Sequence, residues 1–376
     1  MKKNYGFNGL LAVLLLSIVL AGCKKEVVWQ PGMPMPREKI KVAVIHPNEI
    51  DSNSLYDYAH YMGTLEMQKD IGLADYQILR KFNVYDANPA QAEWAIRDCI
   101  AEGANVIITT SRGYIDVCEK LAREFQQVIF VNTTCYKYNN SNLTSYSAKV
   151  YQARYLSGIV AGMRTKTGHI GYVAAKGSNN SEVTRGINAF AMGVEAVNPA
   201  ARVHVRIIYN WYDPMGEADA ANALIAFGCD VITAHSNTSA PQIAAQKAGV
   251  WSIGFNSDMS ADAPEAVITS VVPHWGIFYT KLVESIINGT FKAKPFLYGL
   301  SEGAVDITPL NEKLAAKGTV AAVEAARQSI IREGFNIFDG VLKTNDGRTV
   351  GEPGKTLSDE SIFNSINWYY RNVAEL

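Results

Sequence analysis

Apolar and polar positions follow each other along this chain in a regular order, with short apolar runs separated by longer amphipathic stretches. The short runs are rich in β-branched residues and end at proline, serine or threonine, which is typical of buried strands. In the first third of the chain, strands are predicted at 41–47, 76–84, 105–111 and 128–134, and helices at 55–71, 90–103 and 114–125. Strands that alternate with helices of this length predict a parallel sheet with helices on both faces.

The same order of elements returns in the middle of the chain. A helix with small residues on one face is predicted at 145–163, followed by strands at 169–175, 203–210, 230–236 and 250–256 and helices at 185–197, 217–227 and 240–248. We therefore predict two doubly wound α/β lobes joined by a hinge. The first lobe is expected to comprise residues 39–144 plus about 273–376, and the second lobe residues 145–272.

The N-terminal residues depart from this pattern. Their apolar run is too short for the roughly 20 residues that a membrane-spanning helix needs, and two lysines at its start are typical of an export signal. The motif Leu20-Ala21-Gly22-Cys23 resembles a bacterial lipobox, although an ordinary cleaved signal is the alternative. We predict a lipoprotein signal peptide at 1–22, lipidation of Cys23 and a proline-rich tether at 23–38. The protein would then be anchored by lipid at the cell membrane, facing the periplasm or the outside.

Composition narrows the classes of function. The chain has 376 residues, of which 48% are hydrophobic and 19% charged, and its net charge is −1, so it can form the cores of two domains. Near-neutral charge argues against a nucleic-acid partner, because phosphate contacts need a clustered basic surface. The cysteines other than Cys23 lie far apart and lack a disulfide spacing, so buried free thiols are expected at Cys99, Cys118, Cys135 and Cys229.

Candidate ligand-binding residues lie in the loops that leave the predicted strands, where ligands of doubly wound sheets bind. These loops follow His46, Thr110, Thr134, Ala175, Asn210, Ala234 and Phe255. In the first loop, Tyr56 offers a flat face for a planar ligand, and the Asn53 amide both donates and accepts hydrogen bonds. The alternative is that Tyr56 packs within its own lobe and Asn53 caps the helix.

The loops of the second lobe add an aromatic residue and a carboxylate. Trp211 directly follows a strand and faces either the cleft or the lobe surface, while the neighbouring Asp213 is predicted to cap a helix. Asp258 either accepts hydrogen bonds from a ligand or caps its own backbone. Weaker candidates in these loops are Ser111, Arg112, Arg185 and His235.

The motifs of zinc metalloproteases and of P-loop enzymes are not found in the sequence. It contains no HExxH or GxxxxGK[ST] motif, and its six histidines lack metal-ligand spacing. We therefore expect a binding protein that needs no metal or cofactor.

Several motifs occur together over the whole mature chain, among them YDYAHYMG, TTSRGY, ARYLSGIVAGM, VTRGINAF, NWYDP and IGFNSDMSA. In their order and spacing they resemble the basic membrane protein family of lipoproteins, the substrate-binding components of purine and nucleoside ABC transporters. The resemblance implies the type I periplasmic binding protein fold, a purine base or nucleoside held between aromatic rings, and delivery to ABC permease and ATPase subunits.

The resemblance also implies roles for individual residues. Tyr56 looks like the aromatic residue of the first lobe, Trp211 matches that of the second lobe, and Asp258 matches the acidic ligand contact. Asn53 stands where many relatives have aspartate, and Arg112 stands where many have an aromatic residue. These two departures favour a ligand rich in acceptors, such as an oxopurine rather than adenine.

Taken together, these patterns predict a monomeric, lipid-anchored binding protein that closes over a purine base or nucleoside. A sensing or surface lipoprotein without a permease, or an enzyme acting on nucleosides, is the alternative. From about Ser301 the chain is expected to return across the hinge and pack on the first lobe. A hairpin is predicted near the C-terminus, with Asp346-Gly347 at its turn.

Overall fold

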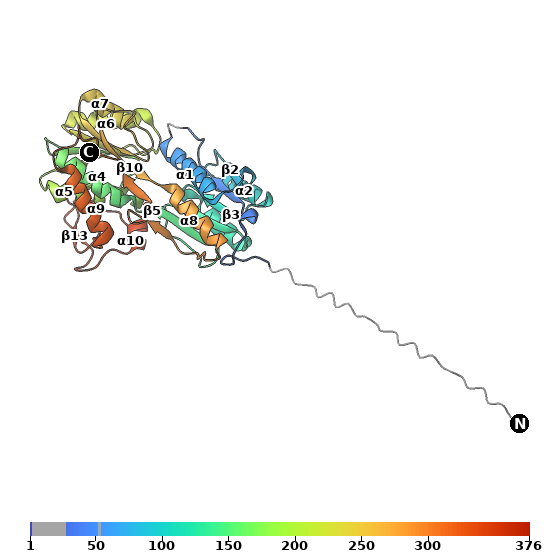
Figure 1. Cartoon of the computed structure of the whole chain (residues 1–376). Helices are drawn as coiled ribbons and strands as arrows, with labels where there is room; N and C mark the ends of the chain where they lie inside the picture. The colour runs from blue at the N-terminus through green and yellow to red at the C-terminus, as the bar shows by residue number, and fades with distance from the viewer. Residues whose placement is uncertain (2–27, 52–53) are drawn as a thin grey trace.

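The computed structural model describes residues 28–51 and 54–376, together with Met1, and it forms two α/β lobes that lie side by side (Figure 1). The first lobe contains strands β1 (Val42–Ile45), β2 (Ile78–Lys81), β3 (Val106–Thr109), β4 (Ile129–Thr133), β5 (Leu143–Ala148) and β11 (Phe296–Tyr298), and helices α1 (Leu55–Ile71), α2 (Pro89–Ala101), α3 (Ile115–Glu124) and α8 (Trp275–Ile287). The second lobe contains strands β6 (His169–Ala174), β7 (Arg202–Ile207), β8 (Val231–His235), β9 (Trp251–Phe255), β10 (Val267–Pro273), β12 (Val305–Ile307) and β15 (Val373–Glu375). Its helices are α4 (Val150–Arg164), α5 (Ser181–Val197), α6 (Pro214–Phe227), α7 (Ala240–Ala248), α9 (Thr319–Arg332) and α10 (Asp359–Asn364).

The sheet of the first lobe has the strand order β11-β5-β4-β3-β1-β2, and all of its pairings are parallel. The four residues of β1 are buried, and their side chains alternate between the two faces. Val42 and Val44 pack with residues of α1 and α8, whereas Ala43 and Ile45 pack with residues of α2 and α3. Helices therefore cover both faces, as the apolar runs predicted.

The sheet of the second lobe has the order β12-β10-β9-β8-β6-β7-β15. Its pairings are parallel except that of β12 with β10. Residues of α4, α5, α9 and α10 form the core on one face, and residues of α6 and α7 form the core on the other. The predicted fold, two doubly wound lobes of the type I periplasmic binding protein class, is confirmed.

Helices α4 and α5 approach each other closely because each contributes a glycine. A Cβ atom on Gly158 would lie 2.1 Å from the carbonyl oxygen of Phe190, and one on Gly193 would lie 2.0 Å from the carbonyl oxygen of Tyr155. The small residues predicted on one face of α4 therefore serve helix packing. This contact holds the second half of α5 against α4, while the first turn of α5 lies beside the cavity between the lobes.

The chain passes between the lobes at three places within residues 54–376. The passages lie between β5 and α4, between β10 and α8, and between β11 and β12. These crossings form the hinge that the two-lobe prediction requires, since hinges are short segments between rigid bodies.

The predicted position of the C-terminal segment is wrong. After the third crossing the chain stays with the second lobe, where β12 pairs with β10 and β15 pairs with β7. Phe338, Phe363 and Trp368 are buried in the core of that lobe. Strands of only three residues have too little alternation to be read from sequence, and burial of these aromatic side chains determines which lobe the segment joins.

Two smaller predictions are confirmed. Strands β13 (Leu342–Lys343) and β14 (Thr349–Val350) form the C-terminal hairpin, with Gly347 at φ +86° in its turn. The four described cysteines are buried free thiols.

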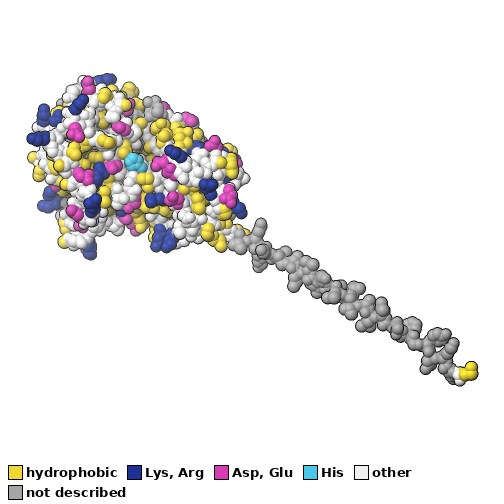
Figure 2. All heavy atoms as spheres, in the orientation of Figure 1, with side chains coloured by type: hydrophobic (Ala, Val, Ile, Leu, Met, Phe, Trp, Pro, Cys, Tyr) yellow, Lys and Arg dark blue, Asp and Glu magenta, His cyan; other side chains and the backbone are white. Residues whose placement is uncertain are grey.

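On the face shown in Figure 2, basic and acidic side chains are interspersed over both lobes. Within the described part of the chain, no helix has the length and apolar character that a membrane span requires.

Candidate functional site

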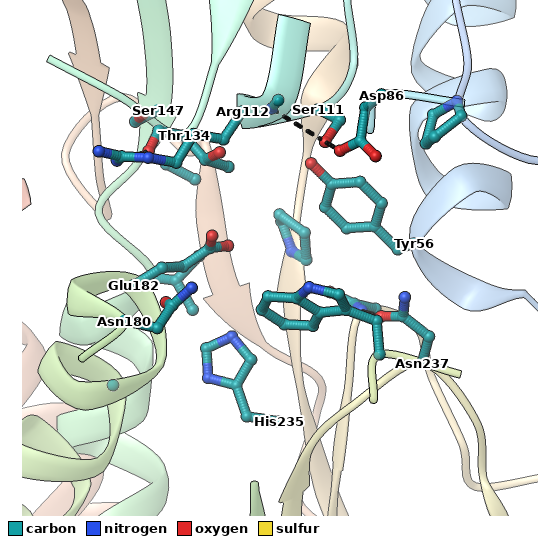
Figure 3. A pocket seen from close by; sticks show the side chains of 18 of the residues that line it. Tyr56, Asp86, Ser111, Arg112, Thr134, Ser147, Asn180, Glu182, His235 and Asn237 are labelled. Atoms are coloured by element: carbon teal, nitrogen blue, oxygen red, sulfur yellow. Dashed lines mark hydrogen bonds between the residues drawn. The ribbon is translucent and has the colours of Figure 1, made fainter. Parts of the chain in front are cut away.

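A cavity of about 610 Å³ lies between the two lobes. Its walls are loops that follow the carboxyl ends of strands in both sheets, as expected for this class of fold. Figure 3 shows first-lobe and second-lobe side chains facing each other across it. The lining residues of the first lobe include Tyr56, Asp86, Ser111 and Arg112. Those of the second lobe include Glu182, Arg185, Trp211, His235 and Asn237.

Tyr56 forms an aromatic part of the first-lobe wall. It lies in the first turn of α1, and its hydroxyl donates a hydrogen bond to the Thr110 carbonyl at 2.9 Å. Its ring contacts His60 edge-on, with centroids 4.5 Å apart, and lies 6.3 Å from the ring of Trp275. The ring of Tyr56 is therefore fixed at its edge and at its hydroxyl, and its remaining surface is free to contact a ligand.

A buried aromatic cluster supports Tyr56. His60 stacks on Trp275 with centroids 4.1 Å apart, and its Nδ1 is hydrogen-bonded to the Tyr279 hydroxyl at 2.5 Å. The Tyr279 hydroxyl lies 3.0 Å from that of Tyr146. Burial lowers the pKa of His60 well below its usual value, so the ring is neutral. This neutral, rigid aromatic cluster keeps the first-lobe wall in place.

Asp86 and Ser111 form a second part of this wall. The Ser111 hydroxyl donates a short hydrogen bond to Asp86, and Figure 3 shows both side chains beside Tyr56. Gly113 permits this approach, because a Cβ atom there would lie 2.7 Å from the Asp86 carboxylate. The neighbouring Arg112 is exposed, and its Nη1 donates to the Thr134 carbonyl at 3.2 Å.

Trp211 and Asn237 belong to the opposite wall. The backbone N–H of Asn237 donates to the Trp211 carbonyl at 2.9 Å, which joins the loops after β7 and β8. The ring of Trp211 lies 6.2 Å from that of His235. Burial, together with the charges of Arg154 and Arg185, lowers the pKa of His235 well below its usual value. This wall therefore presents an indole, a neutral imidazole and an amide to the cavity.

The first turn of α5 brings charge to the same wall. The Asn180 side chain caps this helix by accepting from the Val183 N–H at 3.1 Å. Arg185 is buried, lies over the ring of Phe363 at 4.4 Å and donates to its carbonyl at 3.4 Å. Burial lowers the pKa of Arg185 to about 10, against the opposing effect of Glu182. Burial also raises the pKa of Glu182, which Arg185 and Arg112 counteract.

Five of the residues proposed from sequence line the cavity, namely Tyr56, Ser111, Arg112, Arg185 and Trp211. Asp258 is exposed outside the lining, and its carboxylate accepts from the backbone N–H of Ser260 at 2.9 Å, which is the local cap given as the alternative. Asp213 accepts from the Gly216 N–H at 3.0 Å and caps α6 as predicted. Asn53 and Cys23 lie outside the described residues.

Among the lining residues that the sequence interpretation missed are Asp86, Trp275 and Glu182. Asp86 follows β2, and the loop after this strand was not among those singled out. Trp275 is the first residue of α8, directly after the second crossing, and this connection was not among the loops singled out. Glu182 has the position of an ordinary first-turn acid, although its place in the loop after β6 could have marked it. Among residues 28–51 and 54–376, no cluster of three or more His, Cys, Asp or Glu has the arrangement of a metal site.

Comparison with known proteins assigns the class. A family model described as "ABC transporter substrate-binding protein PnrA-like" matches residues 39–339. The chain is 32% identical over 350 residues to a purine-binding protein of Brucella abortus, which covers 91% of this chain and 95% of that protein. It is 31% identical over 344 residues to a Haloferax volcanii protein named as an ABC transporter glucose-binding protein, covering 91% of this chain and 82% of that protein.

A solved solute-binding protein of an ABC transporter system from Conexibacter woesei shares the fold, with a TM-score of 0.65 at 22% identity, covering 79% of this chain and 98% of that one. The chain therefore belongs to the Bmp family of ABC transporter substrate-binding proteins. Such proteins bind a ligand outside the cytoplasm and interact with permease components. The family resemblance inferred from the motifs is confirmed.

Proposed function

We propose that this protein captures a purine base or a purine nucleoside in the cavity between its lobes and delivers it to an ABC permease. The observation that carries the proposal is that Tyr56 and Trp211, from different lobes, line one cavity together with charged and amide side chains. Aromatic faces suit the π-face of a base, and stacking contributes about 1–3 kcal/mol per base. The purine-binding relative from Brucella abortus supports the same ligand class.

Closure of the lobes would remove water from the two aromatic faces and strengthen the polar contacts around the ligand. In this proposal Ser111, Arg112 and Arg185 contribute polar contacts. The contact of Asp258 with the ligand stays a prediction, and the exposed position of its side chain does not favour it. Strongly weakened binding by Asp258→Ala would support that contact, whereas unchanged affinity would remove it.

A sugar is the second candidate ligand. The Haloferax volcanii relative carries the name of a glucose-binding protein, and an indole beside carboxylate, guanidinium and amide groups also suits a ring bearing hydroxyls. A purine differs from a hexose because it offers two flat faces and few hydroxyls. A ligand panel therefore separates the two candidates directly.

The membrane attachment is proposed from the sequence of residues 20–23. Lipid on Cys23 would hold the binding protein beside its permease, and stable anchoring takes more than one acyl chain. Labelling cells with a radioactive fatty acid tests this point. Label on the wild-type protein and none on Cys23→Ala is expected, whereas equal label on both would contradict the attachment.

The experiment that tests the ligand class is a thermal shift assay on purified protein that has been unfolded and refolded to remove bound ligand. A ligand at 100 times its Kd adds about 2.7 kcal/mol to the free energy of unfolding. The panel contains purine bases, purine nucleosides, pyrimidines, glucose and amino acids. A shift by purines supports the proposal, and a shift by glucose alone contradicts it.

A further inference from the structure

The carboxylate of Glu182 forms no hydrogen bond and no ion pair within the described part of the protein. The residue lies in the first turn of α5, and its side chain points into the cavity (Figure 3). No hydrogen bond or ion pair joins it to residues 28–51 or 54–376. By contrast, Asp86 accepts from Ser111, and Arg185 donates to the Phe363 carbonyl. Glu182 is thus a half-buried carboxylate of the cavity wall whose hydrogen-bonding capacity is open to a ligand.

An unpaired carboxylate in such a wall is costly unless something else satisfies it. Removing a charged group from water without a partner disfavours its ionised form. Burial does raise the pKa of Glu182, while Arg185 and Arg112 oppose this effect. A ligand that offers N–H donors to Glu182 would supply the missing hydrogen bonds, and charge-assisted bonds of this kind are the strong ones.

Arg112 faces this carboxylate from the other lobe. Its guanidinium carries five N–H donors, and only the Nη1 bond to the Thr134 carbonyl is formed with the described residues. Figure 3 shows Arg112 above Glu182 across the open space of the cavity. Arginine commonly donates to the O6 and N7 acceptors of guanine, and carboxylates accept from base amino groups.

A 2-amino-6-oxopurine fits this pair of side chains. Along one edge of the ring it presents two donors, N2–H and N1–H, followed by two acceptors, O6 and N7. Adenine instead presents the N1 lone pair and a single amino group, so a carboxylate would face an acceptor. Hypoxanthine keeps N1–H but lacks the 2-amino group, so it differs from guanine only in the second donor.

We propose that Glu182 determines ligand specificity by accepting hydrogen bonds from N1–H and the 2-amino group of a guanine-type base, whose O6 and N7 accept from Arg112. This inference rests on the proposed purine-binding function and extends it to one subclass. Glu182 thereby takes the role of acidic ligand contact that the sequence had suggested for Asp258. Because the two side chains come from different lobes, the ligand joins the lobes in the closed form.

Isothermal titration of the refolded protein with guanosine, inosine and adenosine tests the inference. A good bidentate pair is worth about 5- to 150-fold in discrimination, so the wild type should bind guanosine at least 5-fold more tightly than inosine. In Glu182→Gln, one amide oxygen replaces the carboxylate and an NH₂ group now faces the ligand. The affinity of this variant for guanosine should fall, and its affinity for adenosine should rise relative to its affinity for guanosine. The ratio of the affinities for guanosine and inosine should approach one.

Glu265→Gln is the matched control, because Glu265 is an exposed glutamate of the same lobe outside the cavity lining. Glu265→Gln should keep the wild-type ratios between the affinities for guanosine, inosine and adenosine. If purines bind but Glu182→Gln has the same affinity ratios as Glu265→Gln, the inference is wrong and the proposed function stands. If the wild type binds none of the three nucleosides and none of the bases guanine, hypoxanthine and adenine, the proposed function is wrong and the inference falls with it. The guanosine-to-inosine ratio of the wild type is a test that does not depend on any variant folding.

Discussion

Glu217 connects the two loops that carry Trp211 and Asn237, and its replacement by glutamine is expected to affect both stability and binding. The residue is fully buried at the start of α6. Its Oε2 accepts from the Ser236 hydroxyl at 2.8 Å and from the Thr238 hydroxyl at 2.7 Å. The Thr238 N–H donates to the same oxygen at 3.3 Å. Oε1 accepts from the Asp213 N–H at 3.2 Å.

The expected magnitude follows from these four bonds. In Glu217→Gln the amide oxygen can accept the three bonds of Oε2, but each changes from a charged bond, worth about 1.5–3 kcal/mol, to a neutral one of about 0.5–1.5 kcal/mol. The amide NH₂ then faces the Asp213 N–H, so two donors meet and that bond is lost. Burial raises the pKa of Glu217, so removing the charge returns part of the loss. A net decrease of about 1–3 kcal/mol in the free energy of unfolding is expected.

Urea denaturation followed by tryptophan fluorescence measures this decrease, and titration with the ligand found in the panel measures binding. Asp219→Asn is the matched control, because Asp219 is an exposed acid of the same helix. Glu217→Gln should also weaken ligand binding several-fold, since the Trp211 loop loses its support. Equal urea midpoints and equal affinities for the two variants would refute the reasoning.

Three further predictions concern the site, the pH dependence and the helix packing. Trp211→Ala should weaken purine binding by about 5- to 150-fold through loss of stacking. Trp94→Ala, which removes an exposed tryptophan on α2, should leave binding unchanged, and equal purine affinities of the two variants would contradict this prediction. Burial lowers the pKa of His46 to about 3, so between pH 6.5 and pH 3 the unfolded state binds more protons than the folded state. As the pH falls through this range, His46 therefore lowers the free energy of unfolding by about 1.4 kcal/mol per pH unit. His46→Leu should lose this contribution, and parallel pH profiles of urea stability would contradict it. Gly193→Ala places a Cβ atom 2.0 Å from the Tyr155 carbonyl oxygen and should lower the free energy of unfolding by about 1–3 kcal/mol, which an unchanged urea midpoint would exclude.

Much of the fold was predictable because its main elements are long enough to carry a period. The strands of both sheets are short apolar runs between amphipathic helices, and this order alone predicts two parallel sheets. The C-terminal segment was not predictable in the same way. Its strands β12 and β15 have three residues each, and the side chains that determine its lobe are scattered along the segment.

The candidate site was predictable only in part, because sequence identifies loops but not the direction of side chains. Tyr56, Arg112 and Trp211 were found because they lie on the segments that lead from strands into helices, where ligands of such sheets bind. Asp258 was chosen from its place in the loop after a strand and from the family resemblance, and its side chain accepts from its own loop, which was the alternative. Glu182 looked like an ordinary helix-start acid, and only the three-dimensional arrangement shows that its side chain lines the cavity without a hydrogen bond to residues 28–51 or 54–376.

The most direct test of the central claim is a calorimetric titration of the refolded wild-type protein with a purine nucleoside and, separately, with glucose. Guanosine should bind with one ligand per protein and with a Kd in the micromolar range or below, and glucose should give no saturable heat. Saturable binding of glucose without binding of any purine base or nucleoside would contradict the claim that this cavity serves purines.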